Sequence, residues 1–232
     1  MENSILIHHV LLALDFPVYL SAVRIRHRKD GIPHGAYSGW VHIVNIVQLS
    51  NGLKYMLDVG FGGDGATAPL PLIPNTPHTN LGTQEVRLIR DWIPTQLHRQ
   101  DEESKMWIYQ YRNDVSQQWN SFFAFQEVEA MENDFRVVNW YTGSHPESFQ
   151  TFTQLVVKFM RQPVVAGTEE QEIYGKRMLV NNVVKENIGG KTCAVQECRT
   201  EADRIQALRK WLGMEFTEEE KRGIQGWSTE LR

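Results

Sequence analysis

Residues 39–63 read Gly39-Trp-Val-His42-Ile-Val-Asn-Ile-Val-Gln-Leu-Ser-Asn51-Gly52-Leu-Lys-Tyr-Met-Leu-Asp58-Val-Gly-Phe-Gly-Gly63. Two apolar runs rich in β-branched residues flank the Asn-Gly pair, which is a strong signal of a β-hairpin. His42 lies in the first run, and Asp58 ends the second run. Folding this hairpin would bring the imidazole and the carboxylate onto neighbouring strands.

This arrangement is the one in which a carboxylate fixes the tautomer of a histidine and the histidine activates a nucleophile. A lone histidine in an apolar strand is more often a core residue, whereas a buried aspartate is costly unless it is paired. On spacing alone, a catalytic pair and a core pair are about equally favoured. The glycines after Asp58 let a ligand approach the main chain closely. They give only a weak signal of a phosphate loop, because no Gly-Lys-Ser/Thr follows and Pro69 prevents a long helix, so a glycine-rich bend near a binding cleft is favoured.

The composition limits the classes of protein to which this chain can belong. The chain has 232 residues, 41% hydrophobic and 22% charged, with a formal net charge of −4. These values are typical of a globular protein and argue against a general nucleic-acid surface, and no apolar run is long enough for a membrane span. The N-terminus lacks the features of a secretion signal, and two cysteines, Cys193 and Cys198, are too few for a disulfide framework. We therefore expect a cytoplasmic protein without a membrane or nucleic-acid partner, and no residue cluster has metal-ligand spacing.

The remaining patterns predict a helix over residues 3–14. This helix should end near residues 15–17, because Pro17 disfavours a helical residue before it. Helices are expected over 201–212 and from Thr217, where Thr217-Glu-Glu-Glu220 fits a capping box. A boundary is expected near residues 139–148. Strands are predicted over 18–26, 39–49, 54–59, 85–89, 107–111 and 120–125, which suggests a small barrel or sandwich. Further strands are predicted over 149–160 and 173–184, and a turn and a strand over 189–194.

Three segments resemble the arylamine N-acetyltransferases, and most closely the fungal members. They are Gly39-Trp-Val-His42, Leu57-Asp58-Val-Gly-Phe-Gly-Gly63 and Phe135-Arg-Val-Val-Asn-Trp-Tyr-Thr-Gly-Ser-His-Pro-Glu-Ser-Phe149. The resemblance covers essentially the whole chain. It implies an α+β fold with cysteine-protease-like Cys-His-Asp architecture. Residues 1–16 would be the last helix of a truncated helical bundle, 17–145 an antiparallel β-barrel domain and 146–232 an α/β lid.

In that family the nucleophile is a cysteine in an Arg-Gly-Gly-x-Cys-x-Glu-Asn-like motif, and Met1-Glu2-Asn3 resembles its x-Glu-Asn portion. The resemblance places the cysteine directly before Met1, so the chain as given is expected to be inactive. Ser4, where many relatives carry asparagine, is a milder departure.

The resemblance also implies an activity. An acyl group would pass from acetyl-CoA, or from malonyl-CoA as in some fungal relatives, through a cysteine to an arylamine or arylhydrazine, without a metal. It assigns His42 and Asp58 to catalysis, Phe61, Gly60 and Gly62 to the substrate, and Gly39, Gly63 and Thr153 to CoA. The oligomeric state of the protein is left open. Two rivals stay open as well: a non-catalytic protein that binds CoA or a partner, and a transglutaminase-like Cys-His-Asp enzyme fragment.

Overall fold

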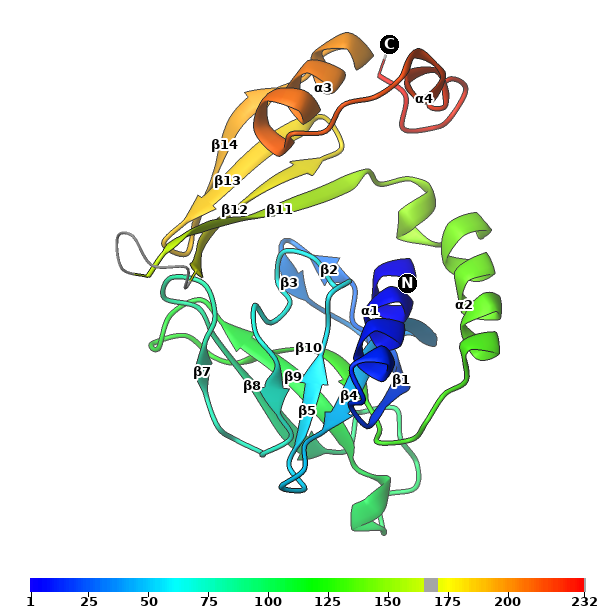
Figure 1. Cartoon of the computed structure of the whole chain (residues 1–232), viewed down its shortest axis with the longest axis vertical. Helices are drawn as coiled ribbons and strands as arrows, with labels where there is room; N and C mark the ends of the chain where they lie inside the picture. The colour runs from blue at the N-terminus through cyan, green and yellow to red at the C-terminus, as the bar shows by residue number, and fades with distance from the viewer. Residues whose placement is uncertain (165–170, 232) are drawn as a thin grey trace. The chain divides into compact units, whose positions relative to one another are not determined.

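The computed structural model describes residues 1–164 and 171–231 (Figure 1). The chain divides into two compact units, which we call unit 1 (Met1–Tyr141) and unit 2 (Thr142–Arg232). Among the described residues, no helix has the length and apolar character needed to cross a membrane.

Unit 1 is built on one antiparallel sheet of eight strands that curls into a nearly closed barrel (Figure 1). The strand order β6-β5-β4-β1-β10-β9-β8-β7 brings β1 beside β10, far along the chain, as well as beside β4. The strands are β1 (Val18–Ile25), β4 (Trp40–Gln48), β5 (Lys54–Leu57), β6 (Leu70–Pro71), β7 (His78–Thr79), β8 (Glu85–Asp91), β9 (Met106–Arg112) and β10 (Asn120–Phe125), with a separate small hairpin of β2 (Arg28–Lys29) and β3 (Ile32–Pro33). A 3-10 turn, η1, covers Glu102–Ser104.

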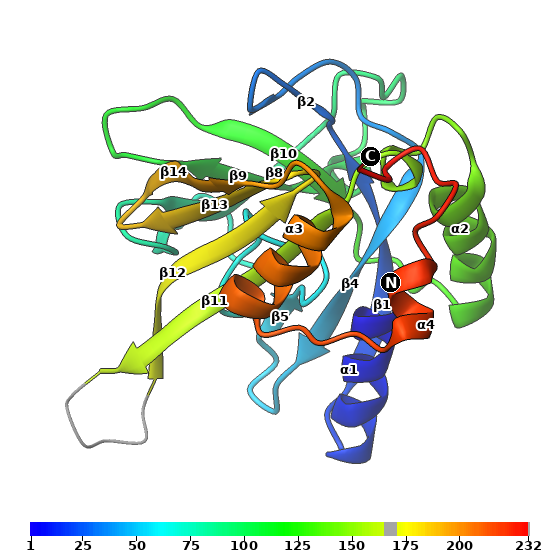
Figure 2. The ribbon, with the colours of Figure 1, turned by 90° about the horizontal axis from the view of Figure 1, so that it is seen from above.

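The barrel interior is filled by aromatic and branched side chains, since Tyr109, Phe123, Phe125 and Val44 are all fully buried. Helix α1 (Glu2–Ala13) packs on β1 and β4, and this contact can be followed in both ribbon views (Figure 2). The contact is apolar, because Met1 and Ile5 join a cluster around Ile43. The first turn of α1 is therefore held against the strand that carries His42.

Unit 2 holds a second antiparallel sheet, in the order β11-β12-β13-β14, with α3 packed on one face. Leu179 and Val184 of the sheet meet Ala207, Leu208 and Leu212 of the helical segment in a buried cluster. The elements are η2 (Phe149–Thr151), β11 (Leu155–Pro163), β12 (Gln171–Val180), β13 (Val183–Ile188), β14 (Lys191–Glu197), α3 (Glu201–Ala207), a π-helical turn η3 (Leu208–Leu212) and α4 (Glu218–Arg222). Helix α2 (Glu132–Ser144) crosses from unit 1 into unit 2.

Most predicted elements are present. The helix at the N-terminus, the Asn51-Gly52 hairpin and the strand over 120–125 are confirmed, and Thr217 caps α4 in a capping box. One element was missed and two expectations are wrong. Helix α2 was not predicted, and residues 149–151 form a 3-10 turn instead of the start of a strand. The strand expected over 173–184 is interrupted by a hairpin turn, where Asn181 adopts a left-handed backbone with φ of +55°. The division into helical remnant, barrel and lid stays a prediction.

Candidate active site

The hairpin of β4 and β5 brings His42 and Asp58 together. β4 pairs with β5 from Asn45↔Leu57 onward, and Asp58 follows β5 directly. The imidazole Nε2 lies 2.7 Å from Oδ2 of Asp58. Both groups are shielded from water, since the side chain of His42 is 10% exposed and that of Asp58 is 0% exposed.

The other carboxylate oxygen of Asp58 is bound by the backbone of residues 60–63, which we call the glycine loop. Oδ1 accepts a hydrogen bond from the N–H of Gly60 at 2.9 Å and a second from the N–H of Phe61 at 3.1 Å. An ionised carboxylate accepts hydrogen bonds only, so this set of donors is suited to the charged form. Nε2 of His42 then carries the proton that it donates to Asp58, which leaves Nδ1 as the basic nitrogen.

Nδ1 of His42 takes part in no hydrogen bond within the described part of the chain. Beside the imidazole stands the ring of Phe61, edge-on with centroids 5.3 Å apart. Phe61 packs in turn on Phe122 at 4.7 Å and Phe123 at 4.9 Å. The hydroxyl of Tyr109 donates to the carbonyl of Asp64 at 2.9 Å, and burial raises its pKa well above the usual range, so it remains a neutral donor. The rings of Phe61, Phe122, Phe123 and Tyr109 form a rigid apolar surface next to the imidazole, which we call the aromatic wall.

Small residues are required where α1 meets the glycine loop. A Cβ on Gly60 would lie 3.0 Å from Oγ of Ser4 and 3.5 Å from Cε1 of His42. Gly62 has a φ of +88°, a conformation that favours glycine. Ser4 is fully buried, and its carbonyl accepts a hydrogen bond from Asn45. The first turn of α1, the loop and the imidazole are therefore in close contact.

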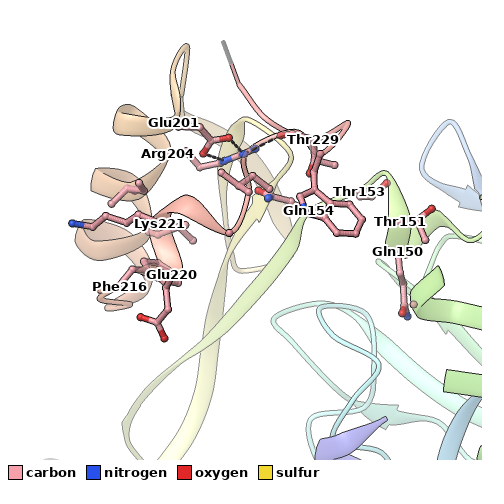
Figure 3. Close-up of a pocket in the computed structure, with 16 residues that line it drawn as sticks. Gln150, Thr151, Thr153, Gln154, Glu201, Arg204, Phe216, Glu220, Lys221 and Thr229 are labelled. Atoms are coloured by element: carbon pink, nitrogen blue, oxygen red, sulfur yellow. Dashed lines mark hydrogen bonds and ion pairs between the residues drawn. The ribbon is translucent and has the colours of Figure 1, made fainter. Parts of the chain in front are cut away.

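The other predicted site residues fall into two groups. Gly63 belongs to the same loop, and Gly39 directly precedes β4, with its carbonyl accepting a hydrogen bond from Oγ of Ser38 at 2.8 Å. Thr153 belongs to unit 2, where it lines a cavity of about 520 Å³ (Figure 3). The buried guanidinium of Arg204, ion-paired with Glu201, also lines this cavity (Figure 3).

Both cysteines belong to unit 2. Cys193 is exposed on β14, and Cys198 is buried in the core, where burial raises the pKa of its thiol. Unit 1 contains no cysteine. Within residues 1–164 and 171–231, no group of three His, Cys, Asp or Glu side chains is arranged to hold a metal ion.

A family model described as N-acetyltransferase matches residues 1–215 of the chain. The chain belongs to the arylamine N-acetyltransferase family. The predicted family membership and the predicted α+β fold are thereby confirmed.

A fungal protein is among the relatives. The N-malonyltransferase FDB2 of Fusarium pseudograminearum is 32% identical over 235 residues, which cover 97% of this chain and 67% of that protein. The chain thus spans about two thirds of the length of this curated relative.

Solved bacterial structures share the fold. The arylamine N-acetyltransferase of Mycobacterium abscessus superposes with a TM-score of 0.74 at 19% identity, covering 93% of this chain and 67% of that chain. The Mycobacterium marinum enzyme in complex with CoA superposes with a TM-score of 0.69 at 22% identity, covering 91% and 68%.

Sequence reasoning missed other residues around His42. Phe122 joins the aromatic wall from β10, and Arg28 lies over its ring with the guanidinium carbon 4.7 Å from the centroid. Arg28 is also ion-paired with Asp64 at 2.6 Å. The available signal was the run Arg24-Ile-Arg26-His-Arg28-Lys29, which places several cations on and after a strand.

Proposed function

We propose that this protein acts in acyl transfer from an acyl-CoA thioester to the nitrogen of an arylamine or arylhydrazine, with His42 as the base and Asp58 as its orienting partner. The observation that carries the proposal is the 2.7 Å contact between Nε2 of His42 and Oδ2 of Asp58, together with the unbonded Nδ1 in the described part of the chain. A base held in one tautomer beside an apolar wall is suited to activating a thiol.

The steps follow the chemistry of a cysteine acyl-enzyme. Nδ1 of His42 takes the proton of a thiol, and the thiolate attacks the thioester carbonyl. CoA leaves as its thiol after receiving that proton, and the acyl group remains on sulfur. The amine then attacks the acyl carbon, His42 takes the amine proton, and the amide and the free thiol are released.

The nucleophile is the part of this scheme that unit 1 does not contain, because both cysteines belong to unit 2. We propose that residues 1–232 bind the acyl donor without turning it over, and that a cysteine directly before Met1 restores transfer. The space around Gly60 supports this: a Cβ built there would lie 3.0 Å from Oγ of Ser4 and 3.5 Å from Cε1 of His42, so the start of α1 lies close to the imidazole.

The test compares three proteins: the 232-residue chain, the same chain with cysteine added before Met1, and the same chain with serine added there. We expect acetyl-CoA-dependent acetylation of an aniline only with the added cysteine, and its loss when His42→Gln is introduced. Transfer by the unextended chain that disappears on His42→Ala would contradict the proposal. Failure of all three proteins to bind CoA would favour a transglutaminase-like amidase, whereas CoA binding without transfer by any of them would favour a non-catalytic protein.

A specific observation favours malonyl over acetyl as the acyl group. Arg28 extends over Phe122, which packs on Phe61, and so brings a cation to the aromatic wall beside His42. One edge of its guanidinium is held by Asp64, and Nε and NH1 make no hydrogen bond with the described residues. A malonyl group differs from an acetyl group by a carboxylate, which a guanidinium binds well. The fungal relative is named an N-malonyltransferase.

Donor preference can be measured by calorimetric titration with malonyl-CoA and acetyl-CoA. We expect the wild-type chain to prefer malonyl-CoA and Arg28→Gln to reduce that preference about tenfold, the value of one charge-assisted hydrogen bond. Arg112→Gln is the matched control, because Arg112 is also ion-paired and also stacks on an aromatic ring. Equal binding of the two donors by the wild-type chain would refute the malonyl assignment and leave acyl transfer intact.

A further inference from the structure

An asparagine interrupts the apolar strand that carries His42. Strand β4 reads Trp-Val-His42-Ile-Val-Asn45-Ile-Val-Gln, and Asn45 is fully buried. Ile43 and Val47, which share its face of the strand, are buried as well. A carboxamide at such a position loses its hydration, which costs free energy unless the group is hydrogen-bonded. Valine or isoleucine would suit the strand better, so Asn45 points to a role outside the sheet.

Only half of this carboxamide is satisfied. Nδ2 of Asn45 donates to the carbonyl of Ser4 at 3.0 Å, which joins residues 41 positions apart in the chain. Oδ1 is buried beside the imidazole of His8 and forms no hydrogen bond of good geometry within residues 1–164 and 171–231. A buried acceptor without a partner costs about as much free energy as one hydrogen bond contributes. The net contribution of Asn45 to stability is therefore small.

The bond that Asn45 makes fixes the first turn of α1 in a way that apolar packing does not. Met1 and Ile5 of this turn join the apolar cluster around Ile43. Burial of apolar surface is not directional, so it holds the helix against the sheet without fixing its position along its own axis. A hydrogen bond to one carbonyl is directional and does fix that position. A single buried asparagine sets the register of packed helices in coiled coils for the same reason.

The turn held by this bond lies beside the imidazole. A Cβ built on Gly60 would lie 3.0 Å from Oγ of Ser4 and 3.5 Å from Cε1 of His42. The carbonyl of Met1 accepts hydrogen bonds from the N–H groups of Ser4 at 2.9 Å and Ile5 at 3.1 Å. A residue attached to the nitrogen of Met1 therefore starts from a fixed point close to the imidazole.

We propose that Asn45 is a positioning residue for acyl transfer. Its bond to α1 sets the distance between His42 and the residue directly before Met1. This inference rests on the proposed function, in which that preceding residue is the cysteine, and it adds the side chain that places the thiol. Asn45 acts through α1 and needs no contact with a substrate. The distance matters because proton transfer needs hydrogen-bond reach, and a displacement of about 1 Å can cost about 100-fold in rate.

The first test is made on the 232-residue chain and needs no catalysis. Asn45→Leu removes both the donated bond and the unbonded acceptor, so we expect the melting temperature to be unchanged or raised. Amide hydrogen exchange at the N–H groups of Ser4 and Ile5 should nevertheless become about tenfold faster, because the turn has lost its anchor. Asn45→Ala guards against overpacking by leucine: it removes the same bond without added volume and should accelerate the same exchange.

Ser21→Ala is the matched control. The buried hydroxyl of Ser21 in β1 donates to the backbone carbonyl of Gln126, so this variant also removes a side-chain bond to a carbonyl, but one that does not involve α1. It should lower the melting temperature and leave the exchange of Ser4 and Ile5 unchanged. The two variants thus separate loss of stability from loss of position.

The second test makes the same changes in the chain that carries cysteine before Met1. Asn45→Leu should lower kcat for acetylation of an aniline about 100-fold and leave the affinity for CoA, measured by calorimetry, unchanged. The pKa of the added thiol should rise toward the free value of about 8.5, because the imidazole no longer lies beside it. This pKa is read from the pH dependence of alkylation by iodoacetamide, with mass spectrometry separating the added cysteine from Cys193 and Cys198. Ser21→Ala should change neither quantity.

The inference is overturned if Asn45→Leu and Asn45→Ala leave the exchange of the first turn as in the wild type. It is also overturned if Asn45→Leu changes neither kcat nor the pKa of the added thiol. The proposed function fails separately: an added cysteine in the otherwise wild-type chain that transfers no acyl group and is alkylated like a free thiol is not paired with His42, and the role of Asn45 in transfer falls with it.

Discussion

Replacing Asp58 with asparagine tests how His42 is held. Asparagine has nearly the shape of aspartate, and its Oδ1 can still accept the hydrogen bonds from the backbone N–H groups of Gly60 and Phe61. Its Nδ2 then faces Nε2 of His42 and can only donate. The imidazole must respond by moving its proton from Nε2 to Nδ1, so that Nε2 becomes an acceptor.

The loss of stability follows from replacing a hydrogen bond to a charged carboxylate by one between neutral groups. The wild-type bond joins a donor to a fully buried carboxylate, and hydrogen bonds to charged groups are worth about 1.5–3 kcal/mol, against about 1 kcal/mol for a neutral pair. Asp58→Asn should therefore lower the free energy of unfolding of unit 1 by about 1–2 kcal/mol. In a protein of this size such a loss corresponds to a fall in melting temperature of about 2–8 °C.

The tautomer is the sharper readout, because loss of stability alone would follow from many substitutions. Long-range ¹H–¹⁵N correlation spectra at mildly alkaline pH should show His42 protonated at Nε2 in the wild type and at Nδ1 in Asp58→Asn. Asp91→Asn makes the same chemical change at an exposed aspartate that accepts a hydrogen bond from Trp92, and it should leave the spectrum of His42 unchanged. An unaltered tautomer in Asp58→Asn would refute the assignment of Asp58 as the orienting partner.

Three other changes test the packing and the titration of the fold. Gly60→Ala should lower the free energy of unfolding of unit 1 by about 1 kcal/mol in urea, because its methyl group would lie 3.0 Å from Oγ of Ser4, and Ser4→Ala in the same chain should recover most of that loss. Gly175→Ala should cost unit 2 about 2–3 kcal/mol, because its Cβ would lie 2.9 Å from a backbone carbonyl oxygen that cannot move aside, whereas Gly143→Ala in α2 meets nothing within 4 Å and should be neutral or stabilising. Burial lowers the pKa of His8, so its contribution to stability is complete above the unfolded value of 6.5 and is lost as the pH falls through the lower folded value. His8→Gln should therefore show a smaller fall in melting temperature on acidification than the wild type, and an equal fall would contradict this reading.

Local signals were sufficient for the part of the fold that carries the histidine and the aspartate. The Asn51-Gly52 pair provides the left-handed backbone that a tight hairpin needs, with a φ of +83° at Gly52. The apolar runs on both sides then fix the register, because a slip of one residue would turn each run to the wrong face. The contact between His42 and Asp58 could therefore be predicted without knowledge of the rest of the barrel.

Elements whose local preference conflicts with their surroundings could not be predicted in this way. Val137 and Val138 favour a strand, but α2 forms because Phe135, Val138 and Thr142 share one helical face, on which Phe135 and Thr142 are buried. The Asn181-Asn182 turn was missed because it lacks the glycine that marks most tight hairpins. Phe122 reaches the site only because β1 pairs with β10, a contact between distant parts of the chain that no local pattern specifies.

The base and its partner are positioned by unit 1 itself and need no nucleophile to hold them. His42 is fixed by the pairing of β4 with β1 and by Asp58, and Asp58 is fixed by backbone N–H groups of the glycine loop. Preorganised groups of this kind incur little reorganisation when a reaction occurs, so the contribution to catalysis that we propose for His42 and Asp58 would be separable from that of the thiol. It follows that an added cysteine has to be placed only by the first turn of α1, which packs on β4 and whose Ser4 carbonyl accepts a hydrogen bond from Asn45. Displacing that turn should abolish the rescued transfer while leaving the tautomer of His42 unchanged.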